Sequence, residues 1–143
     1  MLRSTRASPP WRSGTGHPAD QLSPKTILLV EDNEGVRQLL SRVLSADGYQ
    51  VLEAKDGRQA LGILAQDTPI DLLLTDVVMP GPTGFEVASH FIAARNVPVL
   101  FISGYAQDRT DIPGPILQKP FTPSTLLDIV RRLLEISNPS VRH

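Results

Sequence analysis

The sequence alternates between short apolar runs and longer amphipathic segments, and this alternation restricts the fold more than any other feature. Five apolar runs have the length and composition of buried strands. They cover residues 26–30, 49–54, 71–75, 97–103 and 115–119. Four other segments carry apolar residues at helical spacing. These predicted helices cover residues 36–48, 56–67, 83–95 and 122–137.

Strands that alternate with helices through short links predict a parallel sheet covered by helices on both faces. The predicted strands are almost wholly apolar, as expected when both faces of a sheet are buried. Right-handed crossovers restrict the topology further. In such sheets ligands bind beyond the carboxyl ends of the strands, so functional residues are expected there.

The composition changes near residue 25 and again near residue 137. Residues 1–25 are rich in Pro, Ser, Thr, Gly and Arg and show no periodicity, which predicts a disordered tail or linker. Residues 26–137 are expected to form one domain, and residues 138–143 a frayed C-terminus. A transit peptide is the weaker alternative for the N-terminal segment, because it carries arginine and serine.

Charge and composition exclude several classes of function. The formal net charge of −1 gives no electrostatic reason to expect nucleic acid or an anionic membrane as a partner. The chain has no cysteine, which excludes disulfides, thiol catalysis and thiolate metal sites. No apolar run approaches the ~20 residues of a membrane span, and no secretory signal is present. We therefore expect a cytoplasmic protein.

Polar residues follow four of the five predicted strands. Glu31 and Asp32 follow the first strand, Asp76 the third, Ser103 ends the fourth, and Lys119 ends the fifth. The carboxyl ends of parallel strands meet at one edge of the sheet, so three acids, a hydroxyl and an ammonium should converge there.

Three neighbouring carboxylates repel one another, so such a cluster should raise a carboxyl pKa or bind a cation. Oxygen ligands without His or Cys favour a hard ion such as Mg²⁺. An aspartate can also act as a nucleophile and form an acyl phosphate. Together with the metal, Lys119 would neutralise charge on the transferring group, which is most of what phosphoryl transfer requires.

From about residue 26 to residue 137 the chain resembles the response-regulator receiver domain of two-component signalling. Each motif that carries the resemblance is weak alone, but together, in order and at strand ends, they are highly specific. The matching segments are LLVEDNEGVRQLL (28–40), DLLLTDVVMPGPTGFE (71–86), VPVLFISGYA (97–106) and LQKPF (117–121). The resemblance implies a flavodoxin-like doubly wound sheet with strand order 2-1-3-4-5 and five helices.

The resemblance also implies the function of the acidic residues. Asp76 would accept a phosphoryl group from a phosphohistidine on a histidine kinase or a histidine phosphotransfer protein. Mg²⁺ would be bound by Asp76, by Asp32 directly, by Glu31 through water and by the backbone carbonyl of Val78. Such a domain is a phosphoacceptor rather than an enzyme, with at most self-phosphorylation from small donors and slow autodephosphorylation.

The remaining site residues are assigned by the same resemblance. Ser103 would hydrogen-bond a phosphoryl oxygen and shift on activation, and Lys119 would pair with the phosphoryl group. The bond between Lys119 and Pro120 is usually cis in the family, which proline permits at low cost.

The chain departs from the family pattern in two places. The family often has Tyr or Phe three residues before the lysine, as a rotameric switch, and here that position is Ile116. Tyr105 could substitute, but it lies on a different loop. The segment between Tyr105 and Pro113 has room for barely two helical turns, so we expect a short or missing fourth helix.

Several alternatives stay open. The chain could be a stand-alone receiver or the receiver end of a hybrid histidine kinase, and a monomer or weak dimer is expected. A receiver-like interaction scaffold that is never phosphorylated is the main competing function. Ile116 and the short or missing fourth helix mildly favour it, whereas the intact set of five site residues argues against it. A haloacid-dehalogenase-like phosphatase is disfavoured, because it requires a second Asp where this chain has Val78.

Overall fold

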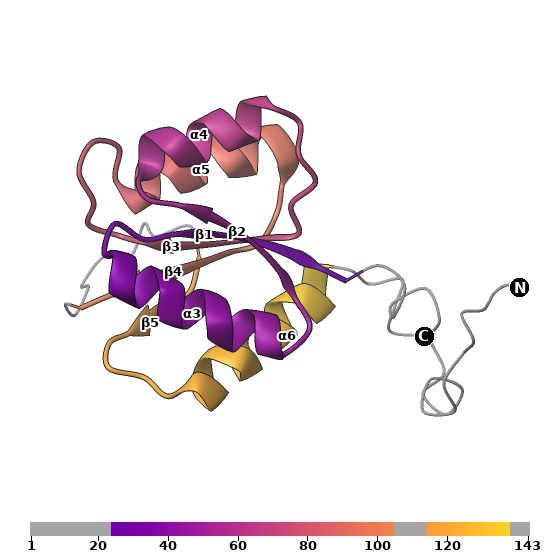
Figure 1. Cartoon of the computed structure of the whole chain (residues 1–143). Coiled ribbons are helices and arrows are strands. Elements are labelled where there is room, and N and C mark those ends of the chain that lie inside the picture. The colour runs from indigo at the N-terminus through magenta and orange to yellow at the C-terminus, as the bar shows by residue number, and fades with distance from the viewer. Residues whose placement is uncertain (1–23, 105–113, 138–143) are drawn as a thin grey trace, which may run out of the picture.

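The computed structural model describes residues 24–104 and 114–137, and within these ranges it shows one five-stranded parallel sheet between two layers of helices (Figure 1). The strand order is β2-β1-β3-β4-β5. The strands are β1 (Thr26–Val30), β2 (Gln50–Ala54), β3 (Leu72–Asp76), β4 (Val99–Ser103) and β5 (Ile116–Gln118). The sequence prediction of a flavodoxin-like doubly wound fold with this strand order is confirmed.

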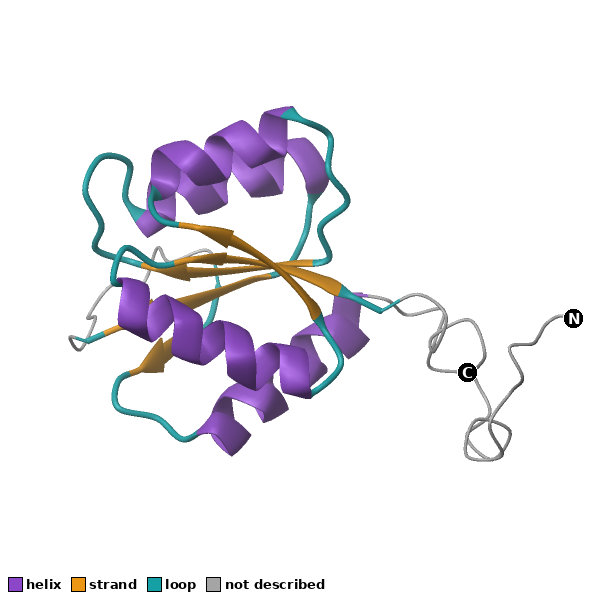
Figure 2. Ribbon diagram, in the orientation of Figure 1, coloured by secondary structure: helices purple, strands orange, loops and turns teal. Residues whose placement is uncertain are grey.

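Four helices occur among the described residues, two on each face of the sheet (Figure 2). They are α3 (Glu34–Ala46), α4 (Gly57–Ala65), α5 (Gly84–Arg95) and α6 (Pro123–Ser137). Helices α4 and α5 cover one face, and α3 and α6 cover the other (Figure 1). No described helix is both long and apolar enough to cross a bilayer.

Alternate residues of each strand supply the two hydrophobic cores, because successive side chains of a strand point to opposite faces. In β1, Leu28 and Val30 pack with α4 and α5, whereas Ile27 and Leu29 pack with α3 and α6. All four of these side chains are fully buried. Burial on both faces explains why the strands lack a polar alternation in the sequence.

Side-chain caps set the helix starts. Asp56 caps α4 and Thr83 caps α5, where Glu86 completes a capping box. The Thr122 hydroxyl accepts a hydrogen bond from the backbone N–H of Thr125 at 3.1 Å at the start of α6. Helix α3 begins two residues earlier than predicted, because the Asn33 side chain accepts a hydrogen bond from the Val36 N–H at 2.9 Å.

The predicted fourth helix concerns residues that the structure does not describe. Between β4 and β5 the described residues contain no helix, and residues 105–113, including Tyr105, lie outside them. The predicted tail, apart from residues 24 and 25, and the predicted frayed C-terminus also lie outside. The domain boundaries therefore stay predictions.

The start of α5 lies directly against the end of β3. A Cβ atom added to Gly84 would lie 2.2 Å from the backbone carbonyl oxygen of Asp76, a distance that real contacts do not reach. The Gly84 N–H also donates to the Val77 carbonyl oxygen at 2.8 Å. A residue without a side chain is thus required where helix α5 meets the strand that carries Asp76.

We expect Gly84→Ala to destabilise the domain by about 2–4 kcal/mol, because the new methyl group must displace backbone rather than a flexible side chain. Urea unfolding followed by circular dichroism would measure the change. Gly62→Ala is the matched control, since Gly62 lies within α4 and an added Cβ would meet nothing within 4 Å. The control should gain about 0.5–1 kcal/mol from better helix propensity. Equal effects of the two substitutions would contradict this account of Gly84.

Candidate functional site

The carboxyl ends of four neighbouring strands form one rim of the sheet, and the polar residues predicted for the site lie there. Glu31 and Asp32 follow β1, Asp76 is the last residue of β3, and Ser103 is the last residue of β4. Lys119 follows β5, and its backbone N–H donates to the Ser103 carbonyl oxygen at 2.8 Å. Parallel pairing of β1, β3, β4 and β5 places these ends side by side.

Three carboxylates come together at this rim. One oxygen from each of Glu31, Asp32 and Asp76 lies within 4.8 Å of the other two. The side chain of Glu31 is only 2% exposed and that of Asp76 13%, whereas Asp32 is exposed. At such separations and an effective dielectric constant of about 20, each pair of full charges costs about 3–4 kcal/mol.

Backbone N–H groups hold two of the carboxylates. Asn33 N–H donates to Oε2 of Glu31 at 3.1 Å, and Val77 N–H donates to Oδ1 of Asp76 at 2.9 Å. The second oxygen of Glu31, Oε1, is buried and accepts no hydrogen bond from the described residues. A buried carboxylate oxygen without a hydrogen bond is costly, so this atom indicates a place for a positively charged partner.

Lys119 places a cation at the rim. Its Nζ lies 3.6 Å from Oε1 of Glu31 and 3.8 Å from Oδ2 of Asp76, so it contacts both carboxylates as an ion pair at distances longer than a hydrogen bond. One ammonium cannot offset three carboxylates. The peptide bond between Lys119 and Pro120 is cis, as the resemblance implied.

The pKa values of the two buried acids are shifted in the same direction. Burial raises the pKa of the Glu31 carboxyl, and the charge of Asp76 raises it further. The N–H of Asn33 and the ammonium of Lys119 oppose this rise. Burial also raises the pKa of Asp76, with Asp32 adding to the rise and Lys119 and the Val77 N–H opposing it. Both shifts disfavour the charged forms that a bound cation would stabilise.

Ser103 and Val78 lie beside this cluster. Ser103 is 1% exposed, and its backbone accepts the Lys119 N–H, so it belongs to the same rim. Val78 lies two residues beyond Asp76, and its side chain is 61% exposed. The site roles given to these two residues by the resemblance stay predictions.

Sequence reasoning missed three contributors to the site. The burial of Glu31 was not foreseen, because a charged residue after a strand is expected at the surface. Asn33 caps α3, a role consistent with its residue type that the sequence analysis does not assign. The contact of Arg37, whose Nη1 donates to the Glu31 carbonyl oxygen at 2.8 Å, has no sequence signal beyond its position on the first turns of α3.

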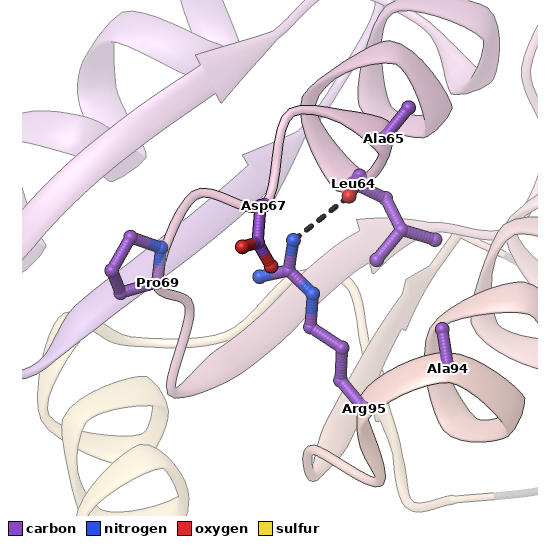
Figure 3. Close-up of a pocket in the computed structure, with 6 residues that line it drawn as sticks. All are labelled: Leu64, Ala65, Asp67, Pro69, Ala94 and Arg95. Carbon is purple, nitrogen blue, oxygen red and sulfur yellow. Dashed lines mark hydrogen bonds between the residues drawn. The ribbon is translucent and has the colours of Figure 1, made fainter.

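A separate hollow of about 580 Å³ lies away from the acidic rim, between the C-terminal ends of α4 and α5 (Figure 3). Its lining includes Asp67, Pro69 and Arg95. The Arg95 guanidinium donates to the carbonyl oxygens of Leu64, at 2.8 Å, and Thr68. The cation of this hollow is therefore occupied in hydrogen bonds to carbonyl oxygens at the C-terminal end of helix α4 and just beyond it.

The donor set of the rim fits a hard divalent cation. Three carboxylate oxygens lie close together, no His or Cys is among them, and Oε1 of Glu31 is buried without a hydrogen bond. Mg²⁺ and Mn²⁺ prefer oxygen ligands of this kind.

A doubly wound five-stranded sheet with an acidic pair, a third acid and a lysine at one rim defines the receiver class of α/β domains. The family model of the response regulator receiver domain matches residues 27–131, and the chain belongs to that family.

Comparison with individual proteins agrees with this assignment. The chain is 32% identical over 120 residues to sporulation initiation phosphotransferase F of Bacillus subtilis, covering 78% of this chain and 95% of the relative. The solved receiver domain of hybrid histidine kinase CckA is 41% identical, with a TM-score of 0.64, covering 76% of this chain and 98% of that chain. The response regulator TrrA of Thermotoga maritima, solved in complex with Mg²⁺-BeF, is 29% identical, with a TM-score of 0.70 and coverage of 76% and 98%.

Other curated relatives are longer than the matched region. The chain spans 37, 53 and 51% of three of them, which are named as response regulators or as a transcriptional regulatory protein.

We expect Asp76→Asn to raise the free energy of unfolding of the metal-free protein by about 1 kcal/mol near pH 7, because it removes repulsion from the other acids at the cost of one ion pair. The pKa of Asp76 is raised in the folded state, so the protonated carboxyl favours folding. This stabilisation of the unsubstituted protein is complete below the ordinary pKa of aspartate and is lost as the pH rises through the folded pKa. The gain should therefore disappear near about pH 4. Urea unfolding at several pH values measures it.

The exposed acid Asp128 on α6 provides the control. Asp128→Asn should change the free energy of unfolding by no more than about 0.5 kcal/mol, both near pH 7 and near about pH 4. Added Mg²⁺ should stabilise the unsubstituted protein more than Asp76→Asn. An Asp76→Asn variant less stable than the unsubstituted metal-free protein at neutral pH would show that the cluster is not repulsive.

Proposed function

We propose that the chain is a phosphoacceptor that takes a phosphoryl group from a phosphohistidine partner onto Asp76, with Mg²⁺, and signals through protein contacts. The observation that carries this proposal is the position of Asp76. It is a partly buried carboxylate at the end of a central strand, 3.8 Å from an ammonium and within 4.8 Å of two further acids. The partner would be a histidine kinase or a histidine phosphotransfer protein.

The carboxylate of Asp76 is held in a defined orientation. Its Oδ1 accepts the Val77 N–H, while Oδ2 lies toward Lys119. In the transfer, an oxygen of Asp76 forms a bond to phosphorus as the phosphorus–nitrogen bond of the donor imidazole breaks, and that electron pair returns to the ring nitrogen. Lys119 would hold a phosphoryl oxygen, and Ser103 would donate a hydrogen bond to another.

Glu31, Asp32, Asp76 and the Val78 carbonyl would hold the metal ion. When bound, Mg²⁺ supplies positive charge that offsets the charge of the phosphoryl oxygens. The buried Oε1 of Glu31, which accepts no hydrogen bond from the described residues, supports this assignment. The relative TrrA, which was solved with Mg²⁺-BeF, supports it as well.

The relatives also suggest the biological setting. One is named as a phosphotransferase and another is a receiver domain of a hybrid histidine kinase, which supports a place in a phosphorelay. The chain would act as a stand-alone receiver or as the receiver part of such a kinase, in the cytoplasm and as a monomer or weak dimer. In either setting it would contact other proteins rather than nucleic acid or membrane.

Incubation of the full chain with Mg²⁺ and acetyl phosphate, or with a phosphorylated histidine kinase, should add one phosphoryl group that intact-mass spectrometry detects. Asp76→Asn should abolish the addition, whereas Asp128→Asn should leave it unchanged because that acid lies on α6. Lys119→Ala should still be labelled, at a rate slowed by up to about 10²-fold. When beryllofluoride is added, the backbone amide NMR signals of β4 and β5 should shift less in Lys119→Ala than in the unsubstituted chain.

A receiver-like scaffold that is never phosphorylated is the second candidate, and Ile116 is the observation that favours it. Ile116 has no aromatic ring that could move between solvent and core. Its side chain is partly buried and packs against the core on the α4 and α5 face. If neither acetyl phosphate nor a panel of phosphorylated kinases adds mass in the presence of Mg²⁺, the scaffold is correct and the phosphoacceptor proposal is wrong.

A further inference from the structure

Arg37 lies on the first turns of α3 and joins three parts of the molecule. Its Nη1 donates to the carbonyl oxygen of Glu31 at 2.8 Å, and its Nε lies 3.2 Å from Oε1 of Glu53 on β2. The Arg37 side chain is 16% exposed, so the contact is largely shielded from water. A partly buried hydrogen bond from a guanidinium is among the stronger polar contacts in a protein.

The hydrogen bond from Arg37 completes the fixation of the Glu31 backbone. On the other side of the same residue, the Glu31 N–H donates to the Ala54 carbonyl oxygen of β2 at 3.0 Å. The peptide group between Glu31 and Asp32 is planar, so holding its carbonyl oxygen also sets the direction in which the chain enters Asp32.

Asp32 depends on this fixation more than the other two acids do. The carboxylates of Glu31 and Asp76 each accept a backbone N–H, and Glu31 is buried while Asp76 is partly buried. Asp32 is exposed, and its carboxylate interacts with the Glu31 carboxyl, so its position depends on the direction of its own backbone and on the placement of Glu31. The peptide group that Arg37 holds leads directly into that residue.

We propose that Arg37 is a positioning residue for the divalent-cation site at the rim, acting through the Glu31 carbonyl oxygen to direct Asp32 into the cluster. This inference rests on the proposed function and deepens it. Arg37 does not touch the cation, because it is itself positively charged and donates to a backbone oxygen. Glu53 orients the guanidinium by its ion pair with Nε.

The geometry of the guanidinium distinguishes Arg37 from a simple positive charge. Its Nε and Nη1 make two contacts in different directions from one planar group. A lysine keeps the charge but offers a single nitrogen, which cannot reproduce this pair of directions. Arg37→Lys therefore separates positioning from long-range electrostatics.

The test measures Mn²⁺ and Mg²⁺ affinity of the full chain, by the EPR signal of free Mn²⁺ and by calorimetry. Arg37→Lys should weaken binding of both ions about tenfold, a typical effect of removing a partner that orients a ligand. Arg42→Lys on the same helix is the matched control, because Arg42 is exposed, and it should bind within about twofold of the unsubstituted chain. The labelling rate of Arg37→Lys by acetyl phosphate should recover at saturating Mg²⁺.

Glu53→Gln gives a second, milder variant, since it keeps an oxygen acceptor for Nε of Arg37. It should weaken ion binding less than Arg37→Lys does, and the double variant should bind no worse than Arg37→Lys alone, because both changes act along one chain of contacts.

The outcomes separate this inference from the proposed function. If Arg37→Lys is less stable to urea but binds Mn²⁺ like the unsubstituted chain, Arg37 is only structural and the inference is overturned, while the proposed function stands. A labelling defect that persists at saturating Mg²⁺ would also overturn it. If the unsubstituted chain binds neither ion, the metal site of the proposed function fails, and the inference with it.

Discussion

The unfavourable proximity of three carboxylates at one end of the sheet is the constraint on which the rest of the site depends. Glu31 is almost fully buried, and Lys119 alone cannot neutralise it together with Asp32 and Asp76. Folding tolerates this arrangement because the two apolar cores on either face of the sheet stabilise the domain independently of the rim. The rim therefore keeps an excess of negative charge in the folded protein, which a bound cation would offset.

Most of the architecture could be predicted, because the hydrophobic pattern and the helix-capping residues indicate the same elements. Apolar runs such as 26–30 are long enough for buried strands, and helices such as α4 have recognisable caps. The site residues followed from topology, since parallel strands bring their carboxyl ends together. The burial of Glu31 and the contact between Arg37 and its carbonyl oxygen could not be predicted, because both depend on side-chain placement across separate elements. Local spacing carries no information about such contacts.

The chain also differs from the expected receiver pattern in how its β4–β5 side is packed. Ile116 pairs in register with Phe101, whose ring meets that of Phe85 edge to face with centroids 5.0 Å apart. Phe101 is fully buried, so the aromatic group of this region is in the core and joins β4 to α5. Among the described residues, the packed contacts that link this side of the domain to the sheet are therefore the pairing of β4 with β5 and the contact between Phe101 and Phe85.

The contact between Gly84 and the Asp76 carbonyl oxygen has a consequence for how the sequence can evolve. Every amino acid other than glycine places an atom where the strand backbone already lies, so position 84 is closed to substitution unless α5 moves outward. Moving α5 outward would disturb the main chain next to Asp76. A substitution of Gly84 would therefore require further substitutions where α5 packs against β3, so that the helix could take a new position.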